Sequence, residues 1–317
     1  MRYRERHEHE TTHRAFAALS IALVAGGIAL RVWQYAGRSA LWTDEAALAN
    51  NIVARSAGRL VMEPLAHNQA APVGFLLIEK LAVSAFGANE LALRAYPLAC
   101  SIVALLLLWR VAGRLLPAIA VPLVLAPFGA APLLIFHAVE VKQYSSDIMI
   151  AIALLLMALE LRAGDDATAP MSARRIVLAA AAGALAVWFS QPAVIVVAGL
   201  GAALAIGALG PRARRPVAPI ALIITAWAGS ALAATIVSFA HLTPDAHRFM
   251  RTFWSDGFWP LSIRHPSSIV WPVEHTALLF GSQLGIPARI GLACALLALA
   301  GLVAPWRPAS RPSLLPP

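Results

Sequence analysis

Apolar runs long enough to cross a lipid bilayer recur along this chain, and charged residues lie almost entirely between them. Hydrophobic residues make up 60% of the sequence and charged residues 13%, whereas soluble domains have roughly 45–50% and about 25%. Too few polar side chains remain to cover a water-soluble core, so a soluble enzyme and a disordered chain are both excluded. The sequence predicts an all-α, multi-pass (polytopic) protein of the cell membrane.

Eight apolar segments are predicted to span the bilayer, whose core of ~30 Å needs about 20 apolar residues in a helix. The first, 15–33, follows an arginine-containing segment and lacks a small-residue cleavage site, so we expect an uncleaved helix. The other seven are 93–113, 117–136, 148–162, 176–190, 193–210, 217–240 and 286–304. We expect one integral membrane domain over 1–317, with both termini on the same side.

The apolar segment 72–87 decides the topology, because every later loop would change sides if this segment spanned the bilayer. It is short and contains Glu79 and Lys80 near its middle. If it does not span, one side gathers the arginines of the short loops and tails, namely Arg2, Arg4, Arg6, Arg14, Arg110, Arg114, Arg162, Arg174, Arg175, Arg212, Arg214, Arg215, Arg307 and Arg311. The positive-inside rule then places that side, with both termini, in the cytoplasm. We therefore predict an amphipathic helix in the outer membrane interface, with Glu79 and Lys80 on its solvated edge.

The net charge of +9 does not indicate nucleic-acid binding, because the cations fall between apolar runs and not on one face. The His, Glu and Arg residues of the N-terminal segment are assigned to a solvated cytoplasmic tail, and a metal-binding tract is the less favoured alternative. Cys100 and Cys294 both lie in apolar runs, so we expect neither a structural disulfide nor a cysteine metal site.

Two long outward loops, 34–92 and 241–285, are where function is expected, because long structured loops often hold functional residues. In the first loop Asp44 and Glu45 open a predicted helix, for which Thr43 or Asp44 would be the N-cap. The ordinary interpretation is that both carboxylates stabilise the helix dipole and that the preceding tryptophan belongs to the interfacial aromatic belt.

A second polar cluster, from His137 to Asp147, lies at the outer end of the third predicted span. Glu140, Tyr144 and Asp147 are four and three residues apart, so we expect them on one helical face. An ordinary polar turn is the alternative, but ionisable groups at membrane depth usually face a cavity or a substrate path. By the predicted topology, this cluster and Asp44–Glu45 lie at the same outer surface and are expected to converge.

These motifs, in this order, resemble the membrane-embedded C-type glycosyltransferases. Asp44-Glu45 after the first helix is followed by N-x-x-x-P (68–72), F-G-x-N-E-x-A-L-R-x-x-P (86–97) and E-V-K-Q-Y-S-S-D (140–147). The likeness is to the family 39 type, which includes dolichyl-phosphate-mannose protein mannosyltransferases and bacterial lipid A aminoarabinose transferases. It covers about residues 15–165, and beyond them only the loop 253–260 looks similar.

The resemblance implies transfer of a hexosyl or pentosyl group from a polyprenyl-phosphate carrier to an acceptor hydroxyl at the outer face of the cell envelope membrane. In this family the aspartate of the first loop is the general base or an acceptor-binding carboxylate, which corresponds to Asp44, with Glu45 in support. An acidic residue of the second loop helps to organise the site or a divalent metal ion, which corresponds to Glu140 or Asp147.

Such a reaction must also stabilise the departing phosphate, which cations do electrostatically. Lys142 is the first candidate and Arg94 the second, although a snorkelling interfacial cation is an equal alternative for Lys142. Gln143 and Tyr144 are further substrate-binding candidates. His67 is a candidate to orient the acceptor or bind a metal.

The second outward loop contains His241, His265, His275 and five aromatic residues between Phe253 and Trp271. They are expected either to stack on sugar rings or to hold the loop at the membrane interface. Two other functions remain open: a transporter or flippase, and a shortened, non-catalytic member of the same fold. Transporters keep their polar groups near the bilayer midplane, whereas here the ionisable residues gather at the outer ends of the spans.

Overall fold

The computed structural model describes residues 2–37, 40–162, 171–209, 217–260, 266–282 and 287–303. All regular secondary structure in these ranges is helical, which confirms the predicted all-α class. Four helices are long and apolar enough to cross a membrane: α1 (Arg2–Ala36, from Thr12), α5 (Glu90–Leu115), α8 (Tyr144–Arg162, to Leu161) and α11 (Val217–Ala240). The fold is therefore that of a multi-pass membrane protein.

The other predicted spans form shorter helices. Segments 176–190, 193–210 and 286–304 correspond to α9 (Ala173–Phe189), α10 (Ala193–Leu209) and α14 (Ala288–Val303). The expectation of one continuous helix over 117–136 is wrong, because the segment divides into α6 (Ala120–Ala130) and α7 (Pro132–His137). Ala131 between them is extended, since the ring of Pro132 disfavours helical backbone in the preceding residue.

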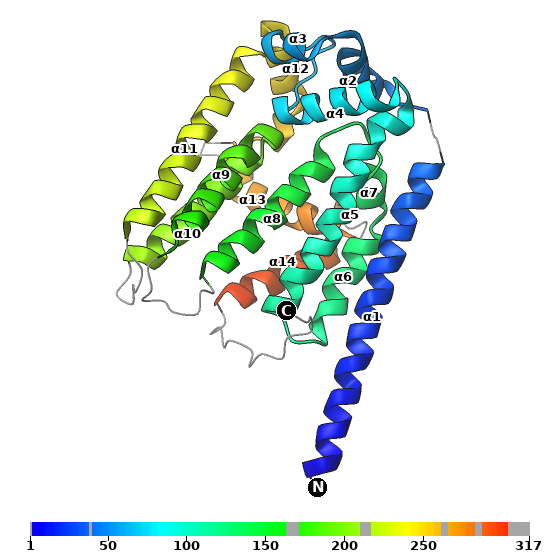
Figure 1. Cartoon of the computed structure of the whole chain (residues 1–317), viewed down its shortest axis with the longest axis vertical. Coiled ribbons are helices and arrows are strands. Elements are labelled where there is room, and N and C mark those ends of the chain that lie inside the picture. Colours follow the sequence, from blue (N-terminus) through cyan, green and yellow to red (C-terminus); the bar gives the residue numbers. More distant parts are fainter. Residues whose placement is uncertain are drawn as a thin grey trace.

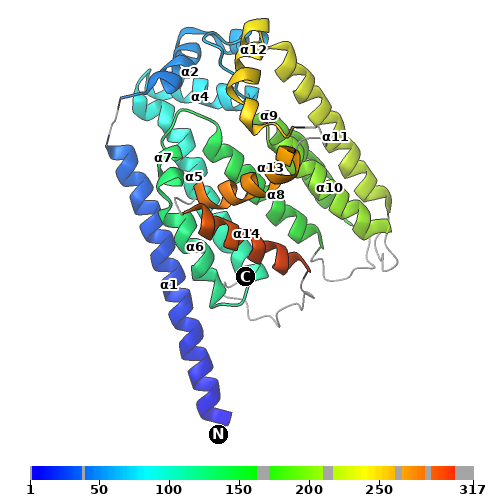
Figure 2. The same ribbon diagram turned by 180° about the vertical axis from the view of Figure 1, so that it is seen from behind.

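Short helices gather at one end of the bundle, opposite the N-terminal end of α1 (Figure 1). They are α2 (Thr43–Ala54), α3 (Ala57–Met62), α4 (Val73–Phe86) and α12 (Pro244–Phe253). Helix α4, which is the predicted amphipathic helix of 72–87, lies across the ends of the long helices and not alongside them (Figure 1). Helices α13 (Pro266–Ser282) and α14 pack against each other on the side of the molecule that faces the viewer in Figure 2.

A buried arginine of α1 joins this helix to α5 and α6. Arg31 of α1 is fully buried, and its guanidinium donates to Ser101 Oγ of α5 at 2.7 Å and to the Gly129 carbonyl of α6 at 3.0 Å. It also donates to the Gly27 carbonyl, so the buried charge is hydrogen-bonded as burial requires. Helix α5 also packs against α8 and α4.

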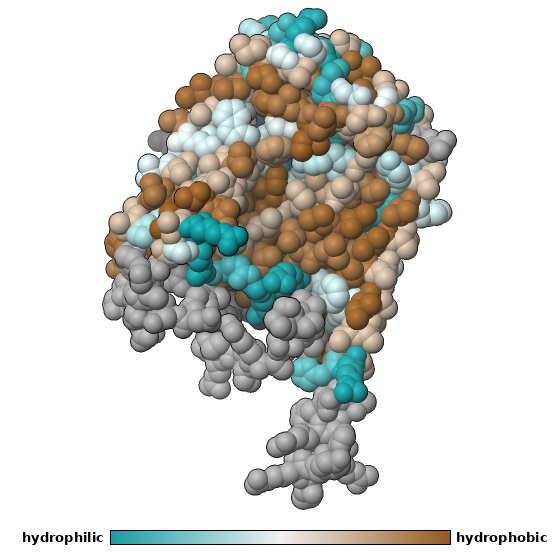
Figure 3. Space-filling model, in the orientation of Figure 1, coloured by the Kyte–Doolittle hydropathy of each residue, from teal (hydrophilic) through white to brown (hydrophobic). Residues whose placement is uncertain are grey.

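Arginine side chains meet at the end of the bundle away from α4. Arg114 at the end of α5 forms an ion pair with Glu160 of α8, and Arg175 at the start of α9 donates to the Glu160 carbonyl at 2.8 Å. Between the two ends, one face of the molecule has a broad apolar band with hydrophilic patches above and below it (Figure 3). Large exposed apolar surfaces of this kind mark contact with a membrane or with another protein.

Candidate functional site

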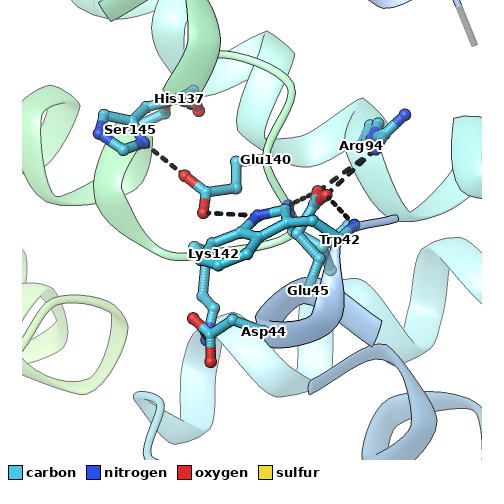
Figure 4. Close-up of polar contacts among 9 residues, drawn as sticks. Trp42, Asp44, Glu45, Arg94, His137, Glu140, Lys142 and Ser145 are labelled. Carbon is cyan, nitrogen blue, oxygen red and sulfur yellow. Dashed lines mark hydrogen bonds and ion pairs between the residues drawn. The ribbon is translucent and has the colours of Figure 1, made fainter. Parts of the chain in front are cut away.

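The two predicted polar clusters meet at the end of the bundle that α2, α3 and α4 cover. The Lys142 ammonium lies 2.7 Å from Asp44 Oδ2, and the backbone N–H of Val141 donates to Glu45 Oε1 at 2.9 Å. The indole N–H of Trp42 donates to Glu140 at 3.2 Å (Figure 4). The expected convergence of the first loop with the segment before α8 is confirmed.

Asp44 and Lys142 are bridged by Gln69. The Gln69 amide N–H donates to Asp44 Oδ1 at 2.9 Å, and its carbonyl oxygen accepts from the Lys142 ammonium at 2.7 Å. The Asp44 side chain is 37% exposed and that of Lys142 only 7%, so a molecule arriving from outside meets the carboxylate first. Partial burial alone would raise the pKa of Asp44, but the bonds from Lys142 and Gln69 and the Lys142 charge outweigh it and lower that pKa.

Glu45 and Arg94 form a buried ion pair behind this group. Arg94 Nη2 lies 3.2 Å from Glu45 Oε2, and both side chains are only 4% exposed. The same carboxylate accepts the backbone N–H groups of Val141 and Trp42. Glu45 thus ties α2, α5 and the segment before α8 together, and Arg94 lies against it and not at the exposed side of the site.

Thr43 is the first residue of helix α2 and not its N-cap. The N-cap is Trp42, which has extended backbone, and Ala46 N–H donates to its carbonyl at 2.9 Å. Trp42 has no side-chain acceptor for the first turn, but the Glu45 carboxylate accepts the Trp42 backbone N–H at 3.2 Å. The expectation of Thr43 or Asp44 as N-cap was therefore wrong, and Asp44 is left free to face Lys142.

Glu140 does not share a helical face with Tyr144 and Asp147, contrary to the expectation from their spacing. Helix α8 begins only at Tyr144, and Glu140 lies in the turn before it. The physical reason is that the Val141 N–H bonds to Glu45 and the Lys142 N–H to the Glu140 carbonyl, so neither enters a helical ladder.

Glu140 is instead the centre of a separate cluster with His137 and Trp42. Its carboxylate contacts His137 Nδ1 through one oxygen and accepts from Trp42 Nε1 through the other. The His137 ring packs edge-on against Tyr144, with ring centroids 4.8 Å apart. The Ser145 hydroxyl donates to the His137 carbonyl at 2.8 Å, which fixes the backbone of the turn.

The loop that presents Gln69 has a strained backbone. Asn51 of α2 accepts the Ala66 N–H at 2.8 Å and donates to the Ala66 carbonyl at 3.2 Å. The next two residues, His67 and Asn68, have φ of 60° and 53°, a left-handed conformation that is uncommon outside glycine. Such strain persists only where the surroundings enforce it and often occurs at functional sites. The His67 side chain is exposed, and its predicted role stays a prediction.

Sequence reasoning missed Gln69, Asn51 and the indole of Trp42. One signal was available, because Asn68 immediately before Gln69 is a residue type that tolerates left-handed backbone. The long-range bonds of Asn51 and Trp42 leave no pattern in the sequence.

Glu79 does not lie on a solvated edge of α4, so that expectation was wrong for Glu79, whereas Lys80 is partly exposed. Glu79 is fully buried, and its two oxygens have no hydrogen-bond partner within the part of the chain that the structure describes. Burial raises the pKa of Glu79 to about 9. Lys80 donates to the carbonyls of Ile52 and Val53 at 3.0 and 3.1 Å, because α4 packs under α2 as well as on α5.

The predicted divalent metal remains a prediction. Both Glu140 oxygens are engaged by His137 and Trp42, and Asp147 lies in the first turn of α8 with one oxygen buried. Gln143 accepts the Asp147 N–H and the Ser146 hydroxyl through its backbone carbonyl. Among the described residues no group of three or more His, Cys, Asp or Glu side chains is placed to hold a metal ion.

A pocket opens beside Gln69. Its polar lining comprises Glu63, Gln69, Gln191, Ser238 and His241, and leucine and alanine residues of 60–76 form its floor. The pocket therefore extends from Gln69 to residues at the ends of α9 and α11.

The second predicted outward loop is partly helical. It forms α12, a short 3-10 turn (Ser255–Gly257) and α13, and His265 lies outside the described residues. The rings of Phe249 and Phe253 stack with their centroids 5.7 Å apart. Several aromatic side chains of this loop are exposed, namely Phe253, Trp254, Phe258 and Trp259. The His275 ring stacks on the Trp271 ring, with ring centroids 3.9 Å apart.

No protein-family model, no curated protein and no solved structure matches this chain.

Proposed function

We propose that this chain is a membrane-embedded glycosyltransferase that moves a sugar from a polyprenyl-phosphate carrier to an acceptor hydroxyl. The observation that supports it best is the Asp44–Lys142 pair, joined across two loops at 2.7 Å and bridged by Gln69. The reaction needs a carboxylate to engage the hydroxyl and a cation to stabilise the departing phosphate, and this pair holds one of each.

Lys142 and Asp44 have different roles in this proposal: Lys142 binds the donor phosphate and Asp44 binds the acceptor hydroxyl. The donor phosphate competes with Asp44 for Lys142, because both are anions that accept from the same ammonium. Once Lys142 turns to the phosphate, Asp44 loses its main partner and is free to accept a hydrogen bond from the acceptor hydroxyl. The buried Glu45–Arg94 ion pair keeps the two loops in place while Lys142 changes its partner from Asp44 to the phosphate.

We further propose that the eight-span topology holds, with this site at the outer face and both termini in the cytoplasm. The Arg114–Glu160–Arg175 contacts support it, because they put the ends of three segments together at the end of the bundle away from Asp44. The positive-inside rule assigns an arginine-bearing end to the cytoplasm. The exposed aromatic residues around α12 then lie at the outer interface, where sugar and lipid headgroup are both within reach.

Transport and a non-catalytic role are the competing functions, and one experiment separates all three. Membrane vesicles containing the protein are given a radiolabelled polyprenyl-phosphate sugar and a crude envelope acceptor fraction. The proposal predicts labelled acceptor together with an equal amount of released polyprenyl phosphate. Intact donor on the opposite leaflet would mean a flippase, and no change in the donor would mean a non-catalytic protein. Either result contradicts the proposal.

A further inference from the structure

We propose that Gln69 is the positioning residue of the Asp44–Lys142 pair and that it leaves Asp44 Oδ2 as the oxygen that binds the acceptor hydroxyl. This inference rests on the function proposed above, and it adds a residue that acts through its two neighbours and not on the reacting atoms. The Gln69 amide can do so because it bonds to both members of the pair at once.

Gln69, Asp44 and Lys142 form a closed ring of three contacts. The Gln69 Nε2 group donates to Asp44 Oδ1 at 2.9 Å, Gln69 Oε1 accepts from the Lys142 ammonium at 2.7 Å, and that ammonium lies 2.7 Å from Asp44 Oδ2. An ammonium has only donors, and an ionised carboxylate has only acceptors. The two charged groups therefore fix the orientation of the amide, with its oxygen toward Lys142 and its nitrogen toward Asp44.

The two oxygens of the Asp44 carboxylate have different partners, so they are not equivalent when the donor binds. A phosphate that draws Lys142 away removes the partner of Oδ2 and leaves the Gln69 bond to Oδ1 in place. Because that bond restrains rotation of the carboxylate, the freed Oδ2 keeps its direction. The acceptor hydroxyl then meets one oriented oxygen at the position that the ammonium has left.

The neutral charge of the Gln69 side chain matters for Lys142. The Lys142 side chain is only 7% exposed, so its ammonium needs partners within the protein. The Gln69 oxygen remains one of these partners while Asp44 is exchanged for the phosphate. A neutral acceptor binds an ammonium less strongly than an anion does. Gln69 therefore holds Lys142 without competing with the phosphate as a second carboxylate would.

The loop that carries Gln69 is anchored to α2, whose first turn provides the carboxylates of the site. Asn51 of α2 is buried, and its side chain bonds to both the N–H and the carbonyl of Ala66. The left-handed residues His67 and Asn68 follow, and the Gln69 amide also donates to the His67 carbonyl at 3.4 Å. Strained backbone persists only where the surroundings enforce it, and here it sets the direction of the Gln69 side chain.

The experiment measures the kinetics of transfer by the full-length protein in vesicles for Gln69→Met and Gln69→Glu, per amount of inserted protein. Methionine has a similar length but makes neither bond, so we expect the KM for the acceptor fraction to rise about tenfold and the KM for the radiolabelled donor not to rise. Glutamate keeps an oxygen for Lys142 but adds a charge, so we expect the KM for the donor to rise about tenfold. Gln34→Met is the matched control, because Gln34 is also half-buried but belongs to α1, which contributes none of the three residues.

A purely structural role of Gln69 predicts a different result. In that case both substitutions lower the amount of active protein and leave the KM values of both substrates unchanged. A wild-type KM for the acceptor in Gln69→Met, or a wild-type KM for the donor in Gln69→Glu, would overturn the assignment of Gln69 while the proposed function stands. A wild-type protein that transfers no sugar overturns both.

Discussion

The Lys142 ammonium lies 2.7 Å from the Asp44 carboxylate, although one residue precedes α8 and the other opens α2. The contact exists because the Glu45–Arg94 pair anchors the start of α2 on α5 and because the Glu45 carboxylate holds Val141 beside it. Two loops that are distant in the sequence are thereby fixed to each other next to a half-exposed carboxylate, and the proposed chemistry depends on this geometry.

Replacing Glu45 with glutamine should destabilise the protein strongly. The substitution removes the negative partner of Arg94 in a site where both side chains are buried, and breaking a buried pair in this way typically costs about 3–5 kcal/mol. Unfolding in detergent, followed by tryptophan fluorescence, measures the loss. The control is Arg248→Gln in the exposed Asp245–Arg248 pair, which should unfold like the wild type. Equal stability of the two variants would contradict the anchoring role of Glu45.

Replacing Glu79 with glutamine should stabilise the protein more at high pH than at low pH. Because burial raises the pKa of Glu79 to about 9, the folded chain holds a proton that the unfolded chain releases above about pH 4.3. Between these values stability falls as pH rises, by up to about 1.4 kcal/mol per pH unit, and the glutamine variant lacks this loss.

Unfolding temperatures of wild type and variant at about pH 5 and about pH 8 test this sign, since the pKa of Glu79 lies above both. Glu63→Gln is the control, because the pKa of the exposed Glu63 is lowered by the hydrogen bond and charge of Arg59, and its titration falls below this window. An equal gain for Glu79→Gln at both pH values would show that the carboxyl is not buried as described.

Gly74→Ala should disturb the packing of α4 against α9 and so destabilise the protein. A Cβ at this position would lie 2.7 Å from the Phe189 ring and 2.8 Å from the Trp188 carbonyl, and backbone cannot yield as a flexible side chain can. Overpacking of this kind typically costs about 1–3 kcal/mol. Gly58→Ala in α3 is the matched control, because a Cβ there meets nothing within 4 Å. If Gly74→Ala matched Gly58→Ala in thermal unfolding, the close contact between α4 and α9 would be refuted.

A reporter fused directly after Arg114 should be cytoplasmic. The expectation follows from the meeting of Arg114, Glu160 and Arg175 at the end of the bundle away from Asp44. Paired alkaline phosphatase and fluorescent protein fusions measure the side, and a fusion after Gly87 should give the opposite pattern. If the reporter after Arg114 were external, the orientation of the protein in the membrane would be the reverse of the proposed one, and the Asp44 site would face the cytoplasm.

The parts of the fold that follow from local patterns were predictable from the sequence. Apolar length identified the long helices, and the charged middle of 72–87 indicated a helix that does not run alongside them. The predicted topology put the Asp44–Glu45 and His137–Asp147 clusters at the same surface, where they could converge, but it did not predict the contact between Asp44 and Lys142. What the sequence could not reveal are features set by long-range bonds: the unwound turn at Glu140, the clamp of Asn51 on Ala66 and the bridge of Gln69. Glu79 was predicted wrongly because a charged residue in an amphipathic segment normally faces water, whereas here Glu79 is buried near Tyr96 and Cys100 of α5.

Sugar transfer by Asp44→Asn, compared with Asp245→Asn in the same vesicle assay, tests the central claim most directly. Asparagine keeps the size of Asp44 but loses the charge that pairs with Lys142, whereas Asp245 lies exposed on α12 outside the site. The account predicts that Asp44→Asn transfers no sugar above background while inserting into the membrane like the wild type, and that Asp245→Asn transfers normally. Wild-type transfer by Asp44→Asn would contradict it.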